Sequence, residues 1–355
     1  MTILATGCAG FIGSNFVIDW LDNNDEEIVN LDKLTYAGNL NNLISLEGNK
    51  NHIFVEGDIG DSDVLKKQLI KFKPRAILNF AAESHVDRSI DSAESFMQTN
   101  VIGTSRLLEC TKNYWQSLPQ KEQKEFRFLH VSTDEVYGSL REDASAFVET
   151  SRYKPNNPYS ASKASSDHLV RAYNHTYGLP VLTTNCSNNY GPYQFPEKLI
   201  PLTIQNALTQ TSLSIYGDGL HIRDWLYVSD HCNAIRAVLE RGIVGEVYNI
   251  GGLNEKTNIE VIHVLCDILD ELRPLSSDNI IKSYRDLIVF VKDRPGHDRR
   301  YAINATKIET ELNWRPKETF DSGIRKTVEW YLNNAKWVDR VISGEYRNWI
   351  KRQYS

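Results

Sequence analysis

The chain has 355 residues, of which 41% are hydrophobic and 10% aromatic, and its formal net charge is −6 at neutral pH. This is ordinary globular composition, with ample apolar material for a core. The absence of a long basic run argues against nucleic acid or an anionic membrane as the main partner, and no stretch approaches the ~18 consecutive apolar residues of a membrane span.

Strands and helices alternate through the first half of the chain. The first predicted strand, at residues 2–6, leaves no room for a signal peptide before it. Between it and the next strand, Phe16 and Trp20 lie on one face of a predicted helix. Further apolar runs predict strands at 27–32, 52–58, 76–82, 126–132 and 181–185. Units of this kind predict an α/β fold with a Rossmann-like, doubly wound parallel sheet.

The turn after the first strand is rich in glycine. The segment TGCAGFIG, residues 6–13, has glycines at positions 7, 10 and 13. Glycine permits a tight turn and lets backbone N–H groups approach a pyrophosphate at a helix N-terminus, where the helix dipole favours anions. Between a strand and a helix, this motif predicts a dinucleotide site. We interpret Cys8 within it as a small filler.

Two acids further along indicate which dinucleotide is bound. Asp32 ends the second predicted strand, 19 residues after Gly13. A carboxylate there can accept hydrogen bonds from the ribose hydroxyls of NAD and would repel the 2′-phosphate of NADP, although the adjacent Lys33 weakens that discrimination. Asp58 follows the third strand, where it can bind the adenine amino group or, alternatively, cap the next helix. NAD is the predicted cofactor.

A pair of adjacent acids follows the fifth predicted strand. The segment VSTDEVYG, residues 131–138, places Asp134 beside Glu135. Successive strand residues point to opposite faces, so both acids can face one substrate only if the chain leaves β geometry at about Thr133, as we predict. Like charges at close range resist double ionisation, so one acid should hold a proton at neutral pH. The sequence leaves open which one, and a solvated acidic turn is the alternative.

The segment YSASK, residues 159–163, begins another predicted helix. Tyr159 and Lys163 are four residues apart, so they share one face of it. A tyrosine with a pKa of about 10 is a poor base at neutral pH. A lysine ammonium and a positively charged nicotinamide would stabilise its phenolate and make it an effective one. A surface Tyr–Lys pair is the alternative interpretation.

The pattern of the chain changes after about residue 190. Prolines and apparent loops at 217–225, 274–279 and 292–300 predict a smaller lobe, while 247–252 again has the pattern of a sheet strand. We predict an NAD-binding domain over 1–190, with segments around 222–252 returning to it, and a substrate-binding lobe over 191–355. The stretch after Trp337 is basic and aromatic, and we assign it no function.

The cysteines indicate the compartment. Five of them are scattered along the chain, an odd number without CxxC spacing: Cys8, Cys110, Cys186, Cys232 and Cys266. Reduced thiols in a cytoplasmic protein are the expectation.

Several segments together carry a family resemblance. The segments TGCAGFIG, AAESHVDRS (81–89), YSASK and NNYGPY (188–193), with Asp32, resemble the extended short-chain dehydrogenase/reductase family that acts on nucleotide sugars. Within it, the chain is similar to the sugar-nucleotide 4,6-dehydratases over nearly its whole length, in VSTDEVYG, DKLTYAGN (32–39), FPEKLIP (195–201), IRDWLYV (222–228) and RPGHDRRYAI (294–303). Epimerases of the family typically carry small or hydroxylic residues where Asp134 and Glu135 stand.

The resemblance implies a reaction and its partners. The expected reaction oxidises C4 of the glucose in dTDP-glucose, eliminates water across C5 and C6, and returns the hydride to C6, with tightly bound NAD, no metal, and a homodimer as the assembly. UDP-glucose as the substrate, or C4 epimerase or decarboxylase activity, are alternatives. A non-catalytic NAD-sensing regulator is a further one, from another class of protein.

Carried onto this chain, the family's assignments make Glu135 the C5 base and Asp134 the C6 acid. Thr133 would hydrogen-bond the C4 oxygen beside Tyr159, and Lys163 completes the catalytic set. The predicted cofactor-binding residues are Gly7, Gly10, Phe11, Ile12, Gly13, Asp32, Lys33, Thr35, Asp58, Ile59, Ala81, Ala82, Ser84, Thr99, Tyr159 and Lys163. The predicted substrate-binding residues are Ser84, Thr133, Glu135, Asn188, Lys198, Leu199, Arg223, Asn258, Arg294 and His297. Of these, Arg223 and Arg294 are the expected pyrophosphate ligands, because guanidinium binds phosphate oxygens bidentately.

Overall fold

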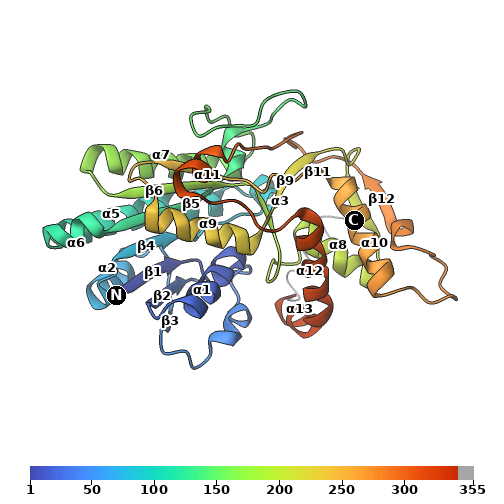
Figure 1. Cartoon of the computed structure of the whole chain (residues 1–355), viewed down its shortest axis with the longest axis horizontal. Coiled ribbons are helices and arrows are strands. Elements are labelled where there is room, and N and C mark those ends of the chain that lie inside the picture. Colours follow the sequence, from blue (N-terminus) through green and yellow to red (C-terminus); the bar gives the residue numbers. More distant parts are fainter. Residues whose placement is uncertain (343–355) are drawn as a thin grey trace.

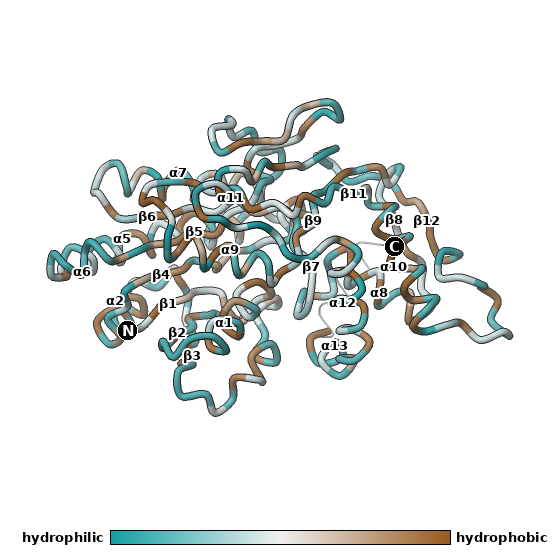
Figure 2. The backbone as a smooth tube through the Cα atoms, in the orientation of Figure 1, coloured by the Kyte–Doolittle hydropathy of each residue, from teal (hydrophilic) through white to brown (hydrophobic). Residues whose placement is uncertain are grey.

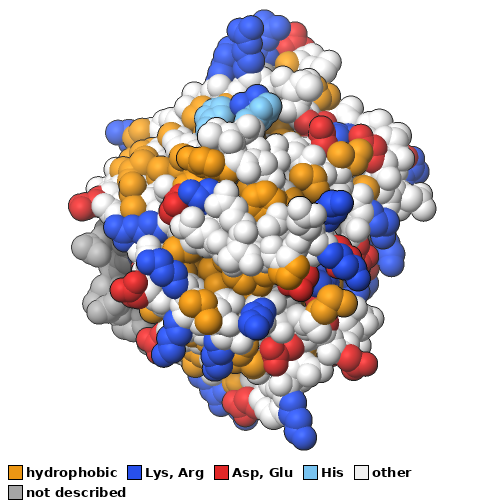
Figure 3. Space-filling model, turned by 90° about the vertical axis from the view of Figure 1, so that its left-hand side faces the viewer, with side chains coloured by type: hydrophobic (Ala, Val, Ile, Leu, Met, Phe, Trp, Pro, Cys, Tyr) orange, Lys and Arg blue, Asp and Glu red, His pale blue; other side chains and the backbone are white. Residues whose placement is uncertain are grey.

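The computed structural model describes residues 1–342 (Figure 1). Most of the stretch after Trp337, residues 343–355, therefore lies outside the described residues. Among the helices described, none is both long enough and apolar enough to cross a membrane. On the face shown in Figure 3, acidic and basic side chains are interspersed with exposed apolar ones.

A seven-stranded sheet forms the larger part of the molecule, and all its pairings are parallel. Its order is β10-β6-β5-β4-β1-β2-β3, so the predicted doubly wound α/β fold is confirmed. The strands are β1 (Thr2–Thr6), β2 (Glu27–Asp32), β3 (His52–Glu56), β4 (Ala76–Asn79), β5 (Arg127–Thr133), β6 (Val181–Cys186) and β10 (Val247–Ile250).

Helices cover both faces of this sheet, so its central strands β4, β5 and β6 are buried along almost their whole length. On one face, Phe16 of α1 (Phe11–Asn23) and Ile235 of α9 (Val228–Arg241) belong to one buried cluster with strand residues. On the other, α2 (Ser62–Phe72), α5 (Thr104–Ser117) and α7 (Pro158–Tyr177) share a second buried cluster. In Figure 2 the strands between these layers carry brown, hydrophobic stretches interrupted by white and teal residues.

The remaining elements form a smaller group beside the sheet, on the right in Figure 1, with a hydrophobic cluster of its own. It contains a three-stranded sheet of order β11-β9-β7 and a parallel pair, β12-β8. Its main elements are β7 (Asn188–Tyr190), α8 (Leu199–Leu208), β8 (Leu213–Tyr216), β9 (Ile222–Tyr227), β11 (Glu255–Thr257), α10 (Asn258–Leu272), β12 (Ile288–Val291), α12 (Phe320–Asn333) and α13 (Ala335–Val341). The domain boundaries given above stay a prediction.

Shorter elements complete the chain. They are η1 (Leu40–Leu46), α3 (Val86–Asp91), α4 (Glu94–Phe96), the π-helix η2 (Met97–Gly103), α6 (Gln120–Glu125), η3 (Asp134–Tyr137), η4 (Tyr284–Leu287) and α11 (Thr306–Leu312).

The prediction of a loop over 217–225 was wrong for residues 222–225. Ile222–Tyr227 is strand β9, paired with β7 on one side and β11 on the other. The charged Arg223 and Asp224 hide the apolar pattern of a buried strand, yet both are buried. The predicted strand 76–82 also ends early, at Asn79, because the chain then turns along the edge of a cavity that Phe80, Ala81 and Ala82 line.

The strand that precedes the two acids ends where the sequence predicts. Strand β5 stops at Thr133, and Asp134 opens the 3₁₀ turn η3. The Thr133 hydroxyl accepts a hydrogen bond of 3.3 Å from the Glu135 N–H and so caps that turn. Gly138 ends it at φ +86°, a conformation that side chains oppose. The predicted departure from β geometry is confirmed.

The start of α7 is fixed in the same local way. Asn157 and Ser160 form a capping box, and Pro158 takes the first helical position. Tyr159 therefore lies in the first turn of the helix, with Lys163 one turn later on the same face.

Gly138→Ala tests whether the backbone sets the position of the acids. A Cβ there would lie 2.2 Å from the Lys154 carbonyl oxygen, so we expect the unfolding free energy to fall by about 3 kcal/mol or more. Gly48→Ala is the control, because Gly48 has a similar φ of +81° but nothing within 4 Å of the added Cβ; about 1 kcal/mol is expected there. Equal losses in urea unfolding would contradict this.

Candidate active site

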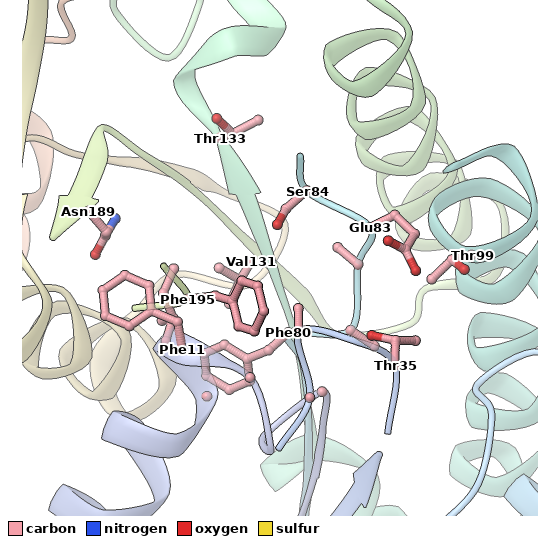
Figure 4. Close-up of a pocket in the computed structure, with 18 of the residues that line it drawn as sticks. Phe11, Thr35, Phe80, Glu83, Ser84, Thr99, Val131, Thr133, Asn189 and Phe195 are labelled. Carbon is pink, nitrogen blue, oxygen red and sulfur yellow. The ribbon is translucent and has the colours of Figure 1, made fainter. Parts of the chain in front are cut away.

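A cavity lies at the carboxyl edge of the parallel sheet (Figure 4), where ligands bind in open α/β folds. In Figure 4, Phe11, Phe80 and Phe195 lie together on one side, and Thr35 and Thr99 lie on the other. Every predicted cofactor-binding residue lines this cavity. The structure thus brings the whole set together, while contact with a cofactor stays a prediction.

The glycine loop forms the floor of this cavity and fits a pyrophosphate. Gly7 adopts φ +73°, and a Cβ on it would lie 2.6 Å from the Ala81 Cα, so only glycine lets these two segments approach so closely. Helix α1 begins at Phe11 without a side-chain cap and without an acid in its first turn. Its N-terminal dipole therefore faces the cavity with no anion from its own first turn to oppose it.

The acids at the edge of the cavity are held by backbone groups. Asp32 accepts hydrogen bonds from the Ala9 N–H (2.8 Å) and the Leu34 N–H (2.9 Å), one on each oxygen. Each oxygen keeps a further lone pair for a ribose hydroxyl. Lys33 donates to the Thr99 hydroxyl at 2.9 Å and lies 3.6 Å from Asp58. The alternative of a helix cap for Asp58 is wrong, because Asp61 caps α2.

A second cavity adjoins the first and shares Ser84, Glu135, Asn188 and Lys198 with it. Leu199, Arg223, Asn258, Arg294 and His297 also line the second cavity, and Thr133 lines the first. All predicted substrate-binding residues are therefore at one of the two cavities. The shared residues lie where a substrate in the second cavity would meet a cofactor in the first.

Two arginines, Arg223 buried and Arg294 half-buried, give the second cavity its positive charge. Arg223 lies over the Tyr301 ring, with 4.5 Å between the guanidinium carbon and the ring centroid. Arg294 donates from Nη1 to Asp87 at 3.1 Å, while its buried Nε has no hydrogen-bond partner among the described residues. A buried, unsatisfied guanidinium N–H fits a phosphate oxygen.

Asp293 and His221 hold the side chain of His297 in place. Its Nδ1 lies 2.7 Å from Asp293, and its ring stacks on His221 with centroids 3.5 Å apart. Burial, with the positive charge of Arg294, lowers the pKa of His297 to about 3, so the ring is neutral. The three side chains bring possible metal ligands within 4.8 Å of one another, but the arginines that lower this pKa also disfavour a cation, and we assign no ion there.

The two adjacent acids occupy unequal surroundings. Asp134 is only 2% exposed, and its Oδ2 has no hydrogen-bond partner among the described residues. Burial raises the pKa of Asp134 well above its usual range, and the negative charges of Glu135 and Asp224 raise it further. Burial also raises the pKa of Glu135, but Arg294, Arg223 and Lys198 all oppose that rise. Arg223 and the Thr133 hydrogen bond also oppose the rise at Asp134, but more cations act on Glu135, so these directions favour Asp134 as the carboxyl that holds the proton.

The Tyr159–Lys163 pair lies beside these acids and is buried with them. Burial raises the pKa of Tyr159, the charge of Glu135 adds to the rise, and a hydrogen bond with Thr133 opposes it. Lys163 donates to the Val131 carbonyl at 2.8 Å. With Lys163 as the only cation beside it among the described residues, the Tyr159 phenol stays protonated. A second positive charge, such as that of a bound nicotinamide ring, is required to make Tyr159 a base.

Sequence reasoning missed several groups that support the site. Glu197 accepts a hydrogen bond from the Tyr36 hydroxyl at 3.0 Å and lies 3.4 Å from Arg88. The Arg88 guanidinium in turn stacks 3.7 Å from the centre of the Tyr36 ring. Glu197 directly precedes Lys198, which lines both cavities, so these contacts of Glu197 fix the segment that carries Lys198. Asp87, the partner of Arg294, was also missed, although it lies inside the conspicuous segment SHVDRS.

Comparisons with known proteins show which family this chain is similar to. The family model described as GDP-mannose 4,6 dehydratase matches residues 4–327. A dTDP-glucose 4,6-dehydratase of Xanthomonas campestris pv. campestris is 60% identical over 98% of this chain and 97% of its own. The dTDP-glucose 4,6-dehydratase of Bacillus anthracis, solved in complex with NAD, is 48% identical with a TM-score of 0.84, covering 96% of this chain and 100% of its own. That of Streptomyces venezuelae, solved with NAD and a dTDP ligand, is 45% identical with a TM-score of 0.86 and the same coverage.

Asp134→Asn tests the proton held by Asp134. A carboxyl whose pKa is higher in the folded state destabilises the fold as pH rises above its unfolded value of about 4, because the unfolded chain then ionises more readily. The uncharged amide removes this penalty. We expect the variant to unfold about 2 °C or more above the wild type near pH 8, with no difference near pH 3.

Asp218→Asn is the matched control of opposite sign. A hydrogen bond from the Leu220 N–H, with one from Arg299, lowers the pKa of Asp218. Its loss should lower the unfolding temperature at neutral pH and have no effect in acid. Thermal scans in which both variants move in the same direction at about pH 8 would rule out a protonated Asp134.

Proposed function

Since this chain belongs to the dTDP-glucose 4,6-dehydratases of the extended short-chain dehydrogenase/reductase family, we propose that it converts dTDP-glucose to dTDP-4-keto-6-deoxyglucose and water. The observation that carries the proposal is the pair Asp134 and Glu135, buried beside Tyr159 with pKa values that their surroundings drive apart. The product is a precursor of rhamnose-type deoxysugars.

The first step is oxidation at C4. NAD, bound in the first cavity, accepts the C4 hydride and returns it at C6. Tyr159 takes the proton of the C4 hydroxyl, and the ammonium of Lys163 stabilises the phenolate that does so. Thr133, which hydrogen-bonds Tyr159, is placed to hold the C4 oxygen in the same position.

Elimination follows because the C4 ketone acidifies the proton on C5, whose carbanion delocalises as an enolate. Glu135 removes that proton as the base. Asp134 gives its proton to the departing C6 hydroxyl, water leaves, and a C5–C6 double bond remains to receive the hydride at C6 and a proton at C5. Two carboxyls with separated pKa values are what such a paired transfer needs.

The arginines hold the other end of the substrate. Arg223 and Arg294 line the second cavity with Lys198 and Asn188, and their forked donors suit the two phosphates of dTDP. A C4 epimerase returns its hydride to C4 and has no use for an acid–base pair at C5 and C6. A regulator without catalysis would not need the Tyr159–Lys163 pair.

The setting of the enzyme is also part of the proposal. A cytoplasmic location is supported by the five cysteines, all of which are free and buried. A homodimer stays a prediction from the family resemblance.

Deuterium at C4 of dTDP-glucose tests the function. We expect NMR to find the label on C6 of a 4-keto-6-deoxy product, because the same hydride moves from C4 to C6. UDP-glucose labelled in the same way tests the choice of nucleotide and should react far more slowly. Label retained at C4 with inversion would make the protein an epimerase, and a lack of turnover would favour the regulator.

Glu135→Gln isolates the base. The amide keeps the shape of the side chain but cannot take the C5 proton, so dehydration should fall by about 10²- to 10⁴-fold while the NAD content stays at the wild-type level. Exchange of solvent deuterium into C5 should be lost with it.

Glu122→Gln makes the same chemical change on the exposed face of α6, away from both cavities. It should leave both measurements at wild-type values. If Glu135→Gln also dehydrates dTDP-glucose at a near wild-type rate, Glu135 is not the base.

A further inference from the structure

A third ionisable side chain lies on the same helix face as Tyr159 and Lys163. Asp167 follows Lys163 by one turn of α7 and Tyr159 by two, so the three align. It is 6% exposed, and the dehydration chemistry described above gives it no role. A buried carboxylate is unfavourable unless its surroundings compensate for it.

Two hydroxyl groups donate to one oxygen of Asp167. Ser132 lies at 2.9 Å and Tyr153 at 3.0 Å from Oδ2. The Asn185 amide donates to the Tyr153 hydroxyl at 3.1 Å, so the phenol proton is left to point at Asp167. Burial raises the pKa of Tyr153 and keeps that proton in place. Both hydroxyl donors therefore lie on this one oxygen of Asp167.

The other oxygen faces a histidine whose tautomer is fixed by its neighbours. His130 is fully buried, and its Nδ1 lies 3.2 Å from Nδ2 of Asn79. The Asn79 oxygen already accepts from Thr6 at 2.7 Å, so the amide donates to Nδ1 and the ring proton is on Nε2. That Nε2 lies 3.4 Å from both Asp167 Oδ1 and Lys163 Nζ.

This tautomer decides how the lysine charge is compensated. Burial and the nearby Lys163 lower the pKa of His130 to about 4, so the ring is neutral. A ring nitrogen that carries a proton cannot accept one from an ammonium group. The neutral imidazole therefore lies between Lys163 and Asp167 without taking a proton from either. The charge that compensates the Lys163 ammonium is that of the Asp167 carboxylate.

We propose that Asp167 is a positioning residue that keeps Lys163 in its ammonium form beneath Tyr159. The proposal rests on the function above, since it concerns the same tyrosine–lysine pair. It makes the three residues of one helix face a single unit, in which a fixed anion holds the cation that the phenolate needs.

The groups that face Lys163 support this assignment. They are Tyr159 and Asp167 on its own helix, His130 on β5 and Cys186 on β6. Burial lowers the pKa of Lys163, and Asp167 is the first of the two groups that raise it. The second, Cys186, has a pKa raised to about 12 by burial, so it is neutral at working pH. A nicotinamide cation nearby increases the need for the anion.

The pH dependence of kcat/KM for dTDP-glucose tests the proposal. In Asp167→Asn, Lys163 loses its proton more easily and the phenol of Tyr159 becomes harder to ionise. We expect the acidic limb of the profile to move to higher pH by about one unit or more, with kcat lowered about tenfold or more at neutral pH. Asp167→Glu keeps the charge and should keep the position of the limb.

Ser132→Ala and Tyr153→Phe are the matched controls. Each removes one hydrogen bond to the carboxylate but no charge, so each should lower the unfolding temperature without moving the limb. An unchanged limb in Asp167→Asn would overturn the proposal. So would a shift to lower pH, which is expected if Asp167 acted on Tyr159 directly, because removing a negative charge eases ionisation of the phenol.

NMR tests the proposal on the wild-type protein, without measuring turnover and without relying on the Asp167→Asn variant. With ¹⁵N-labelled lysine, assigned with Lys163→Met, the Lys163 nitrogen of the wild type should be an ammonium throughout the active pH range, and Asp167 labelled with ¹³C should stay ionised. Protonation of Asp167 in that range overturns the proposal even if Asp167→Asn does not fold. Failure of the wild type to dehydrate dTDP-glucose would refute the function instead, while these titrations would still decide the role of Asp167.

Discussion

Two carboxyl groups set side by side in a largely buried site resist being charged together, and the active site is organised around this constraint. The turn after β5 brings Asp134 and Glu135 together out of water, which alone would keep both protonated. Arginines from β9 and from the loop after β12 then favour ionisation of Glu135 and leave Asp134 as the acid. The acids come from the large sheet and the cations from the smaller group of elements, so the acid–base division exists only when both are in place.

The same logic extends to Tyr159 and Lys163. Two of the groups that must be charged in this site have a partner of opposite sign outside the first cavity: Asp167 for Lys163, and Asp87, which lines the second cavity, for Arg294. Ionisable groups buried in this way lower the stability of the fold, and Asp134, a protonated carboxyl with one oxygen that lacks a hydrogen bond among the described residues, is the clearest instance. Stability is given up where the chemistry needs a fixed field.

Much of this was predictable from local sequence, because the relevant physics is local. The glycine turn, the parallel strands, the Tyr159–Lys163 spacing and the break at Thr133 all follow from a few neighbouring residues. The partners Asp87, Glu197 and Asp167 were not predicted, since their roles depend on contacts with distant segments. Strand β9 was missed because Arg223 and Asp224 are charged, although burial in the site explains both. Which of Asp134 and Glu135 holds the proton could not be predicted from sequence, because it depends on where the arginines lie in three dimensions.

The most direct test of this account is the protonation state of Asp134 itself. Infrared difference spectra between unlabelled and ¹³C-aspartate protein, compared with the same pair for Asp134→Asn, isolate the absorption of this one carboxyl group. The account predicts the C=O stretch of a protonated, weakly hydrogen-bonded carboxylic acid that persists at neutral pH and is absent from the variant. Spectra at neutral pH that contain only ionised aspartate bands, the same in both proteins, would contradict it.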